Sequence, residues 1–275
     1  MNAILTVAAK EFRDGLRNRW IVAITIIFAV LAIGLAYFGA AAAGRVGFTS
    51  LSTTIVSLAS LAVFIIPLIA LMLAYDSVVG EDENGTLLLL LTYPLSRWQL
   101  LLGKMTGHAA IMAFSTLVGF GSAALIMGLF ADNTSWSELI SAFSLFILSA
   151  ILLGWVFIAF AYIISALVTE KSKAAGLALV VWFLFVLVFD LGLLGMLVGT
   201  QGNVNAELFP YLLLLNPTDI FRLVNISYFA SENITGLMAI AQHVQFTTTT
   251  LLLGMVAWLS LSVATALLIF NRRTL

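Results

Sequence analysis

The chain of 275 residues has no cysteine, two histidines and only 9% charged residues. Without cysteine it can form no disulfide, thiolate metal site or thiol nucleophile. An ordinary soluble domain is about 25% charged, whereas 62% of this chain is hydrophobic, so a water-soluble globule is excluded. Lysine and arginine total 12 against 13 acidic residues, which gives a net charge of -1. Because nucleic-acid binding needs a basic excess, nucleic acid is not expected as a partner.

Six almost uncharged apolar stretches are each long enough to cross a membrane, which takes about 20 residues. They cover residues 20–38, 54–75, 107–130, 139–168, 174–198 and 247–270. The predicted fold is an all-α membrane protein with six transmembrane helices, surrounded by lipid. No repeat or low-complexity linker divides residues 1–275, so we expect one domain. The first stretch follows basic residues, as in a signal peptide, but we expect it to be retained as the first span.

Basic residues predict the orientation, because they gather on the cytoplasmic side of a membrane. With six spans both termini share one side, and ten of the twelve basic residues fall there. Only Arg45 and Arg222 fall on the other side. The ten are Lys10, Arg13, Arg17, Arg19, Arg97, Lys104, Lys171, Lys173, Arg272 and Arg273. We therefore predict cytoplasmic termini.

Residues 1–19 form the first of three segments outside the spans. Leu5, Ala8, Phe12 and Leu16 recur at helical spacing, with charged residues elsewhere around the helix. This pattern predicts an interfacial amphipathic helix. We interpret it as an anchor for the first span rather than as a dedicated partner site.

The second segment, residues 76–106, connects spans two and three and predicts a helix, a sharp turn and a second helix. Residues 81–83 are acidic and precede five leucines at 87–91, where negative charge suits a helix N-terminus. Pro94 stops this run. Ser96 and Gln99 match a capping box, so the next helix begins there. The leucines must be buried, either against lipid and neighbouring spans or against another protein.

This segment resembles the first cytoplasmic loop of ABC-2 type exporter permeases. The pattern is Glu-x-x-x-Gly-Thr-Leu-x-x-Leu-Leu-x-x-Pro-x-Ser-Arg-x-x-Leu-x-x-Gly-Lys, from Glu81 to Lys104. The helix with Lys10-Glu-Phe-Arg13, the six spans and the long last external loop extend the resemblance to the whole layout. It implies a bacterial inner-membrane permease that works as a dimer, a second copy of the chain being its partner. The loop would be a coupling helix that docks on a separate ATPase, present in two copies.

The resemblance also implies which residues touch the ATPase. The main contact would lie in the loop, at Glu81, Glu83, Gly85, Thr86, Leu87, Leu90, Leu91, Pro94, Arg97 and Trp98. A second, smaller contact would be the turn at Glu170 and Lys171. The chain itself has no G-x-x-x-x-G-K-[ST] phosphate-binding loop. No cofactor is therefore expected in this chain, and ATP and Mg would be bound by the partner. The chain is predicted to be no enzyme by itself.

The third segment, residues 199–246, is the long external loop. The apolar run 208–215 is too short to span, so we expect short helices at the outer surface. Residues 216–223, Asn-Pro-Thr-Asp-Ile-Phe-Arg-Leu, resemble a branch of the family that serves maturation of nitrous oxide reductase. That resemblance implies a periplasmic accessory protein as partner and a role in supplying copper or sulfur. The expected docking residues are Pro210, Asn216, Pro217, Asp219, Phe221 and Arg222.

Asp190 is the one carboxylate predicted inside a span, which makes it a candidate intramembrane polar site. The alternative is that it meets water or a polar neighbour near the external surface. No metal site is predicted, because His108 and His243 fall on opposite sides and the methionines are scattered. The chain would therefore move something other than bare metal, or move nothing and actuate an external protein, which we favour slightly.

Functions of other classes are less well supported. An intramembrane protease needs a Ser-His pair, paired aspartates or a zinc site at membrane depth, which these residues cannot assemble. A stand-alone secondary transporter that uses Asp190 stays an alternative, although such proteins usually bury several ionisable groups. An ABC-2 exporter of an unrelated amphiphilic substrate is another.

Overall fold

The computed structural model describes residues 3–17, 19–39, 47–48, 50–131, 135–201, 209–229 and 246–273. All regular structure in these ranges is helical. Six helices are long and apolar enough to span a membrane, so the predicted class is confirmed and the chain is a multi-pass membrane protein. The spans are α2 (Trp20–Phe38), α3 (Leu51–Ala74), α6 (Arg97–Phe130), α7 (Trp136–Leu167), α8 (Lys171–Phe183) with its continuation, and α13 (Thr248–Arg272).

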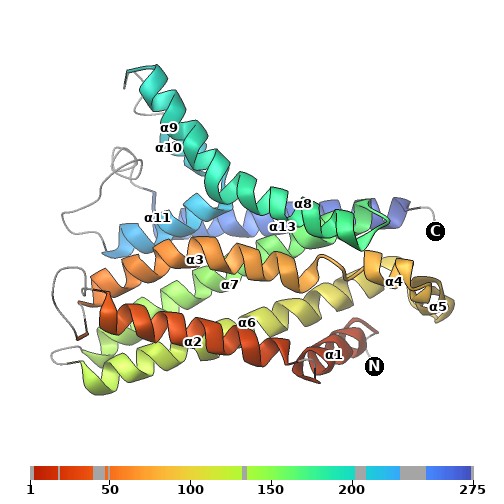
Figure 1. Cartoon of the computed structure of the whole chain (residues 1–275), viewed down its shortest axis with the longest axis horizontal. Coiled ribbons are helices and arrows are strands. Elements are labelled where there is room, and N and C mark those ends of the chain that lie inside the picture. Colours follow the sequence, from red (N-terminus) through yellow and green to blue (C-terminus); the bar gives the residue numbers. More distant parts are fainter. Residues whose placement is uncertain are drawn as a thin grey trace.

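The helix α7 forms the centre of the bundle, because α3, α6 and α13 all pack against it (Figure 1). It is the most buried of the six spans. Aromatic rings fill the space around it: Phe146 lies with its ring centroid 4.9 Å from that of Phe120 on α6, in an edge-on arrangement. The first span, α2, packs on the other side of α6, where Phe28 stacks on Phe120.

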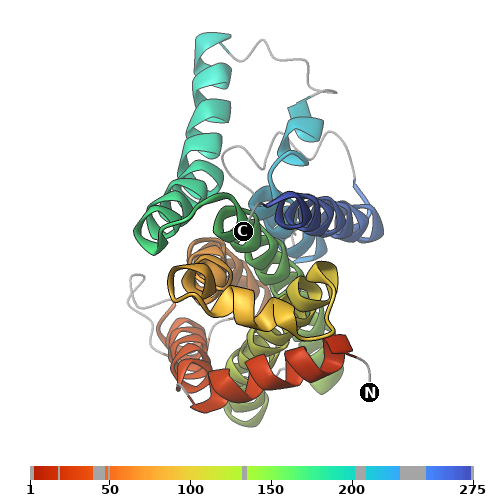
Figure 2. The same ribbon diagram turned by 90° about the vertical axis from the view of Figure 1, so that its right-hand side faces the viewer.

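Both ends of the described chain lie at one end of the bundle, together with α4 (Val79–Glu83) and α5 (Thr86–Thr92), as Figure 1 shows. We call this the α4–α5 end. The helix α1 (Ala3–Arg17) lies across this end (Figure 2). Arg19 has a left-handed φ of 58°, which produces the turn between α1 and α2. An even number of spans requires this common placement of the termini.

Two glycines of α6 let α1 approach closely. A Cβ atom added to Gly103 would lie 2.6 Å from Cβ of Val7, and one added to Gly107 would lie 2.5 Å from Cβ of Glu11. Such small residues, four apart, bring helix backbones together. Leu5 and Leu16 of the predicted apolar face are exposed, because the face with Val7 and Glu11 packs on α6. The placement of α1 at a membrane surface stays a prediction.

The fifth span contains a π-helical turn. After α8 the chain continues through η2 (Leu184–Val188), where the hydrogen bonds are π-helical, into α9 (Phe189–Gly199). The outer part of this span extends away from the other helices (Figures 1 and 2). Only 17% of its apolar window is buried within the chain. Gly195 and Gly199 have no neighbour at the Cβ position within 4 Å.

The long loop contains the predicted short helices, α10 (Phe209–Leu213) and α11 (Pro217–Phe229). The helix α11 packs against α3, α7 and α13. The placement of the two helices at the outer membrane surface stays a prediction. Its residues Ile220, Phe221 and Val224 are fully buried. The apolar face of a short helix is buried here by insertion between spans. We call this opposite end of the bundle the α11 end.

Candidate functional site

Three consecutive acidic residues of α4 each hold a different part of the molecule at the α4–α5 end. Their position ahead of the leucine run was predicted, but their partners were not. Glu81 binds α6, Asp82 binds the chain after α13, and Glu83 binds the first residue of α8. The short helix that carries the loop is therefore attached at three neighbouring points.

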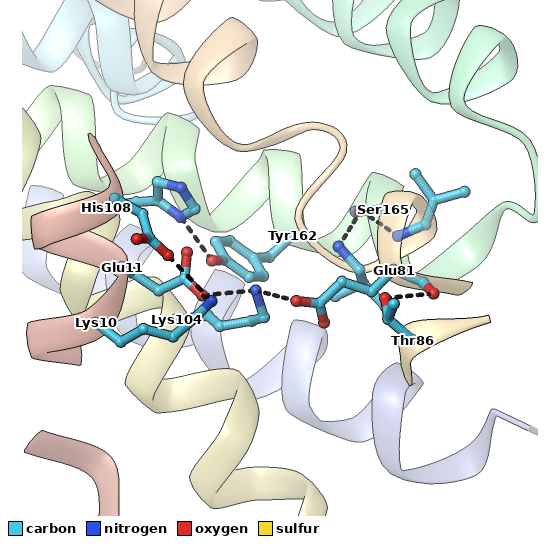
Figure 3. Close-up of polar contacts among 11 residues, drawn as sticks. Lys10, Glu11, Glu81, Thr86, Lys104, His108, Tyr162 and Ser165 are labelled. Carbon is cyan, nitrogen blue, oxygen red and sulfur yellow. Dashed lines mark hydrogen bonds and ion pairs between the residues drawn. The ribbon is translucent and has the colours of Figure 1, made fainter. Parts of the chain in front are cut away.

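The first attachment is a buried ion-pair network around Lys104 (Figure 3). The Lys104 Nζ lies 2.8 Å from Oε1 of Glu81 and 2.9 Å from Oε1 of Glu11 on α1. Its side chain is only 6% exposed. Burial acts to raise the pKa of Glu11, but the charges of Lys104 and Lys10 outweigh it, so the pKa lies below its ordinary value. Lys104 thus joins α1, α4 and α6 through ion pairs with two carboxyl side chains.

The second attachment joins α4 to the end of the chain. A guanidinium nitrogen of Arg273 lies 2.5 Å from Oδ2 of Asp82, and another donates to the carbonyl oxygens of Ser165 and Ala166 at 3.0 Å each. Arg97, at the start of α6, donates to the carbonyl oxygen of Arg273 at 2.7 Å. The chain end is therefore held between α4, α6 and α7.

The third attachment joins α4 to α7 and α8. The backbone N–H of Lys171 donates to Oε1 of Glu83 at 2.7 Å, where a carboxylate also suits the helix N-terminus. The backbone N–H groups of Val78 and Val79 both donate to Oγ of Ser165 at 3.0 Å. The loop and the turn that the resemblance assigns to two separate contacts are thus joined directly. Glu170 itself is exposed and pairs with Lys173.

The exposed face of α5 differs from the predicted one. Leu87 is buried, and Leu90 and Leu91 are half-buried against the core. The large exposed side chains are instead Leu88, 58% exposed, and Leu89, 63% exposed, which the predicted site omitted. Tyr93, just after α5, and Trp98, near the start of α6, are also exposed. We define these four exposed residues, Leu88, Leu89, Tyr93 and Trp98, as the α5 face.

The turns that present the α5 face match the predicted helix, turn and helix. Gly85 has a left-handed φ of 69° between α4 and α5, which a glycine adopts without strain. The hydroxyl of Thr86 donates to the carbonyl oxygen of Glu81 at 3.1 Å. Pro94 lies in the exposed turn after α5, and the backbone N–H of Ser96 donates to Oε1 of Gln99 at 3.0 Å. The predicted capping box is confirmed.

A second polar cluster lies at the α11 end and contains Asp190. Arg222 of α11 bridges two carboxylates, at 2.6 Å from Oδ2 of Asp190 and 3.1 Å from Oδ1 of Asp219. Asp190 therefore meets a polar neighbour, which was one of its two predicted settings. Burial and the charge of Asp190 raise the pKa of Asp219 to about 8. One cation thus lies between two carboxyl groups.

The same helix end is hydrogen-bonded to the π turn of the fifth span. The carbonyl oxygen of Phe185 accepts from Nδ2 of Asn216 at 2.8 Å and from Oγ1 of Thr218 at 3.2 Å. A π turn frees carbonyl groups from the regular helical pattern. Together with the pair of Arg222 and Asp190, these bonds attach α11 to the fifth span at two places.

The residues predicted to dock an external protein are mostly buried in this arrangement. Pro210, Asn216, Pro217, Asp219 and Phe221 are buried, and Arg222 is half-buried. They fix α11 within the bundle. The exposed large side chains of the described part of this segment are Tyr211 and Leu215. Docking on this segment stays a prediction.

The described residues hold no group of three or more His, Asp or Glu side chains placed to bind a metal ion. His108 lies inside the bundle near the α4–α5 end, where its Nδ1 is 2.7 Å from the hydroxyl of Tyr162 (Figure 3). His243 lies outside the described residues.

Comparison with known proteins identifies the class of this molecule. Residues 5–275 match the family described as ABC-2 family transporter protein, and the chain belongs to it. It is 56% identical over 274 residues to a protein of Stutzerimonas stutzeri named "Probable ABC transporter permease protein NosY". It is 52% identical over 273 residues to a protein of the same name from Pseudomonas aeruginosa. In both cases 99% of each chain is covered. The molecule is the permease subunit of an ABC transporter, similar to NosY.

Proposed function

We propose that this permease transmits ATP-driven motion from a separate ATPase, present in two copies, to the α11 end of the bundle. The observation that carries the proposal is that the fifth span makes polar contacts with α4 at its start and with α11 farther along. Glu83 of α4 binds the first residue of α8, and Arg222 of α11 binds Asp190 of α9 in the same span. A displacement of α4 therefore acts on the start of a span that is attached to α11 farther along, at Phe185 and Asp190.

The α5 face is the proposed contact for the ATPase. Its four side chains are large and exposed, and Trp and Tyr are frequent anchors of protein interfaces. The base of the loop is attached to α1, α6, α7, α8 and the chain end. Force applied to α5 is thus received by several helices together. ATP and Mg would be bound by the ATPase, since this chain lacks a phosphate-binding loop.

The proposed setting is the bacterial inner membrane, with the α4–α5 end in the cytoplasm. All the basic residues of the described chain except Arg222 lie at this end. The permease would pair with a second copy of itself along the fifth span, which is largely uncovered within one chain. The bare Gly195 and Gly199 would allow close approach of the two copies.

The full-length likeness to proteins named NosY supports a role in the maturation of nitrous oxide reductase. Supply of copper or sulfur to that enzyme would then involve a periplasmic, NosD-like accessory protein. We favour mechanical actuation of this protein over passage of metal, because the attachment of α11 to the fifth span provides a route for motion.

The ATPase contact is tested by gentle purification of the tagged chain and native mass spectrometry. Two copies of the chain with two of an ATPase are expected. In the double variant Leu88→Ser with Leu89→Ser, the ATPase should no longer be recovered with the permease. If it is still recovered, its ATP hydrolysis should no longer depend on the permease. The control is Leu253→Ser on α13, because Leu253 is also 63% exposed. Recovery of the chain alone from several mild detergents would contradict the proposal.

Transmission along the fifth span is tested separately by a double-mutant cycle with Glu83→Gln and Asp190→Asn. The readout is hydrolysis by the assembled complex with and without its periplasmic partner. If the two substitutions act in the same series of contacts, their effects should be strongly non-additive. Additive effects would contradict this route. Solute movement driven by a pH gradient without any ATPase would favour the stand-alone transporter instead.

A further inference from the structure

The outer surface of α1 contains a hollow that none of the contacts described above uses. It has a volume of about 580 Å³ and is lined by residues of α1. Lys10, Arg13 and Arg17 give it three positive charges against the one carboxylate of Asp14, while Leu5 and Ala9 give it an apolar side. Mixed lining of this kind suits a ligand with an anionic group next to hydrocarbon.

Two of the three cations in this hollow are available to a ligand. The Lys10 Nζ lies 3.3 Å from carboxylate oxygens of both Glu11 and Asp14. Arg13 and Arg17 are exposed, and neither makes an ion pair or hydrogen bond within the described part of the chain. Guanidinium groups bind phosphate oxygens through paired N–H donors. The hollow thus offers two unpaired phosphate-binding groups.

The packing of α1 on α6 supports the prediction that the hollow lies at a membrane surface. The helix α6 has 34 residues, about 51 Å at a rise of roughly 1.5 Å per residue, which exceeds the apolar core of about 30 Å. The excess lies at the start of α6, since Lys104 and His108 are its last ionisable residues before a long apolar run. Gly103 and Gly107, against which α1 packs, fall in this part.

One face of α1 packs against α6, and two other faces of the helix stay uncovered. Leu5, Ala9 and Leu16 form an exposed apolar side, and Arg13 and Arg17 lie next to it around the helix. A helix at this depth can bury such an apolar side among acyl chains while its basic side meets headgroups.

We propose that the α1 hollow binds the headgroup of an anionic phospholipid. The phosphodiester would be held by Arg13 and Arg17, and the attached chains would lie over Leu5 and Leu16. Phosphatidylglycerol should bind better than phosphatidylcholine, which has no net charge. The site needs neither nucleotide nor ATPase, so it stands or falls independently of the function proposed above.

The test uses the full chain in mild detergent with equal amounts of phosphatidylglycerol and phosphatidylcholine, and native mass spectrometry counts the lipids that stay bound. The wild type should retain phosphatidylglycerol preferentially. Each surface cation contributes about a fivefold preference for anionic lipid, so Arg13→Gln with Arg17→Gln should lower the ratio roughly 30-fold. The control Lys173→Gln with Arg272→Gln removes two exposed charges from the same end and should leave the ratio nearly unchanged.

Further variants and competition experiments distinguish between possible ligands of the hollow. Arg13→Lys with Arg17→Lys keeps both charges and should retain most of the preference, which also covers the case in which the glutamine variant fails to fold. Leu5→Ser should weaken binding, and free glycerol phosphate should not displace the lipid. An unchanged ratio in the glutamine variant, or an equal loss in the control, would overturn the proposal. Displacement of the lipid by glycerol phosphate would indicate that the hollow binds a soluble phosphate instead. Displacement by polyglutamate would indicate an acidic protein segment.

Discussion

Replacement of Lys104 by methionine tests whether the buried network holds the α4–α5 end together. The substitution keeps the length of the side chain but removes two charge-assisted hydrogen bonds, to Glu11 and Glu81. Breaking a buried ion pair costs about 3 to 5 kcal/mol. The two carboxylates are 12% and 20% exposed, so water reaches them in part and the lower figure, about 3 kcal/mol, applies.

The expected result is a fall in the unfolding temperature. About 3 kcal/mol corresponds to roughly 6 to 12 °C in a chain of this size. Thermal unfolding in a mild detergent, followed by tryptophan fluorescence, measures it. The control is Lys173→Met, which removes an exposed pair with Glu170 and should cost less than about 1 kcal/mol.

A compensated variant decides whether the loss comes from uncompensated charge. In Lys104→Met combined with Glu11→Gln and Glu81→Gln, no buried charge is left without a partner, so more than half of the lost stability should return. The reasoning is refuted if Lys104→Met unfolds within about 2 °C of the wild type, or if the triple variant is no more stable than the single one.

Three further predictions concern other contacts. Gly103→Val should displace α1, because even a Cβ atom at this position would lie 2.6 Å from Cβ of Val7; trypsin should then cut α1 faster, and an unchanged rate would count against close packing. Arg273→Gln leaves Asp82 without its guanidinium partner, so hydrolysis by the assembled complex should lose coupling while the ATPase still co-purifies; loss of the ATPase itself would show a docking role instead. Burial and a neighbouring carboxylate raise the pKa of Asp219 from its ordinary value of 3.8 to about 8. The folded chain therefore binds this proton more tightly than the unfolded chain, and stability should fall as the pH rises from about 4 to 8. Asp219→Asn should flatten this dependence in thermal unfolding between pH 5 and 8.5, and equal slopes would contradict it.

The spans and the loop could be predicted from the sequence because each depends on local properties. A helix that crosses a membrane needs a long apolar run, and hydropathy finds it without knowledge of its neighbours. The capping box of Ser96 and Gln99 is likewise complete within four residues, and the structure contains it. Lys10 and Asp14, four residues apart on one helix, likewise form a local pair at 3.3 Å.

The partners of the polar residues could not be predicted, because they come from distant parts of the chain. Glu11 lies 93 positions from Lys104, and Asp82 lies 191 positions from Arg273. Both Lys104 and Glu11 stand inside the segments that carry the family resemblance. The resemblance marked these two positions but did not indicate that they form an ion pair. Pairing across such distances depends on how the spans pack.

The α5 face could not be read from the sequence for a different reason. Five identical leucines cover every side of a helix, so their pattern does not say which side is inside. Packing of Leu87 into the core decides it and leaves Leu88 and Leu89 exposed. Insertion of α11 between spans was missed in the same way, because hydropathy alone does not separate a short surface helix from a short buried one.

The three acidic residues of α4 have a mechanical consequence. A rigid body that rests on three separate supports has a fixed orientation, whereas one on two supports can still rock about the line that joins them. Glu81, Asp82 and Glu83 give α4 three such supports, on α6, on the chain end and on α8. Substitution of any one of them should therefore convert a fixed lever into a hinge whose axis passes through the other two. Three single variants would give three different axes of rocking, and each variant would leave a different one of the three supporting elements unloaded.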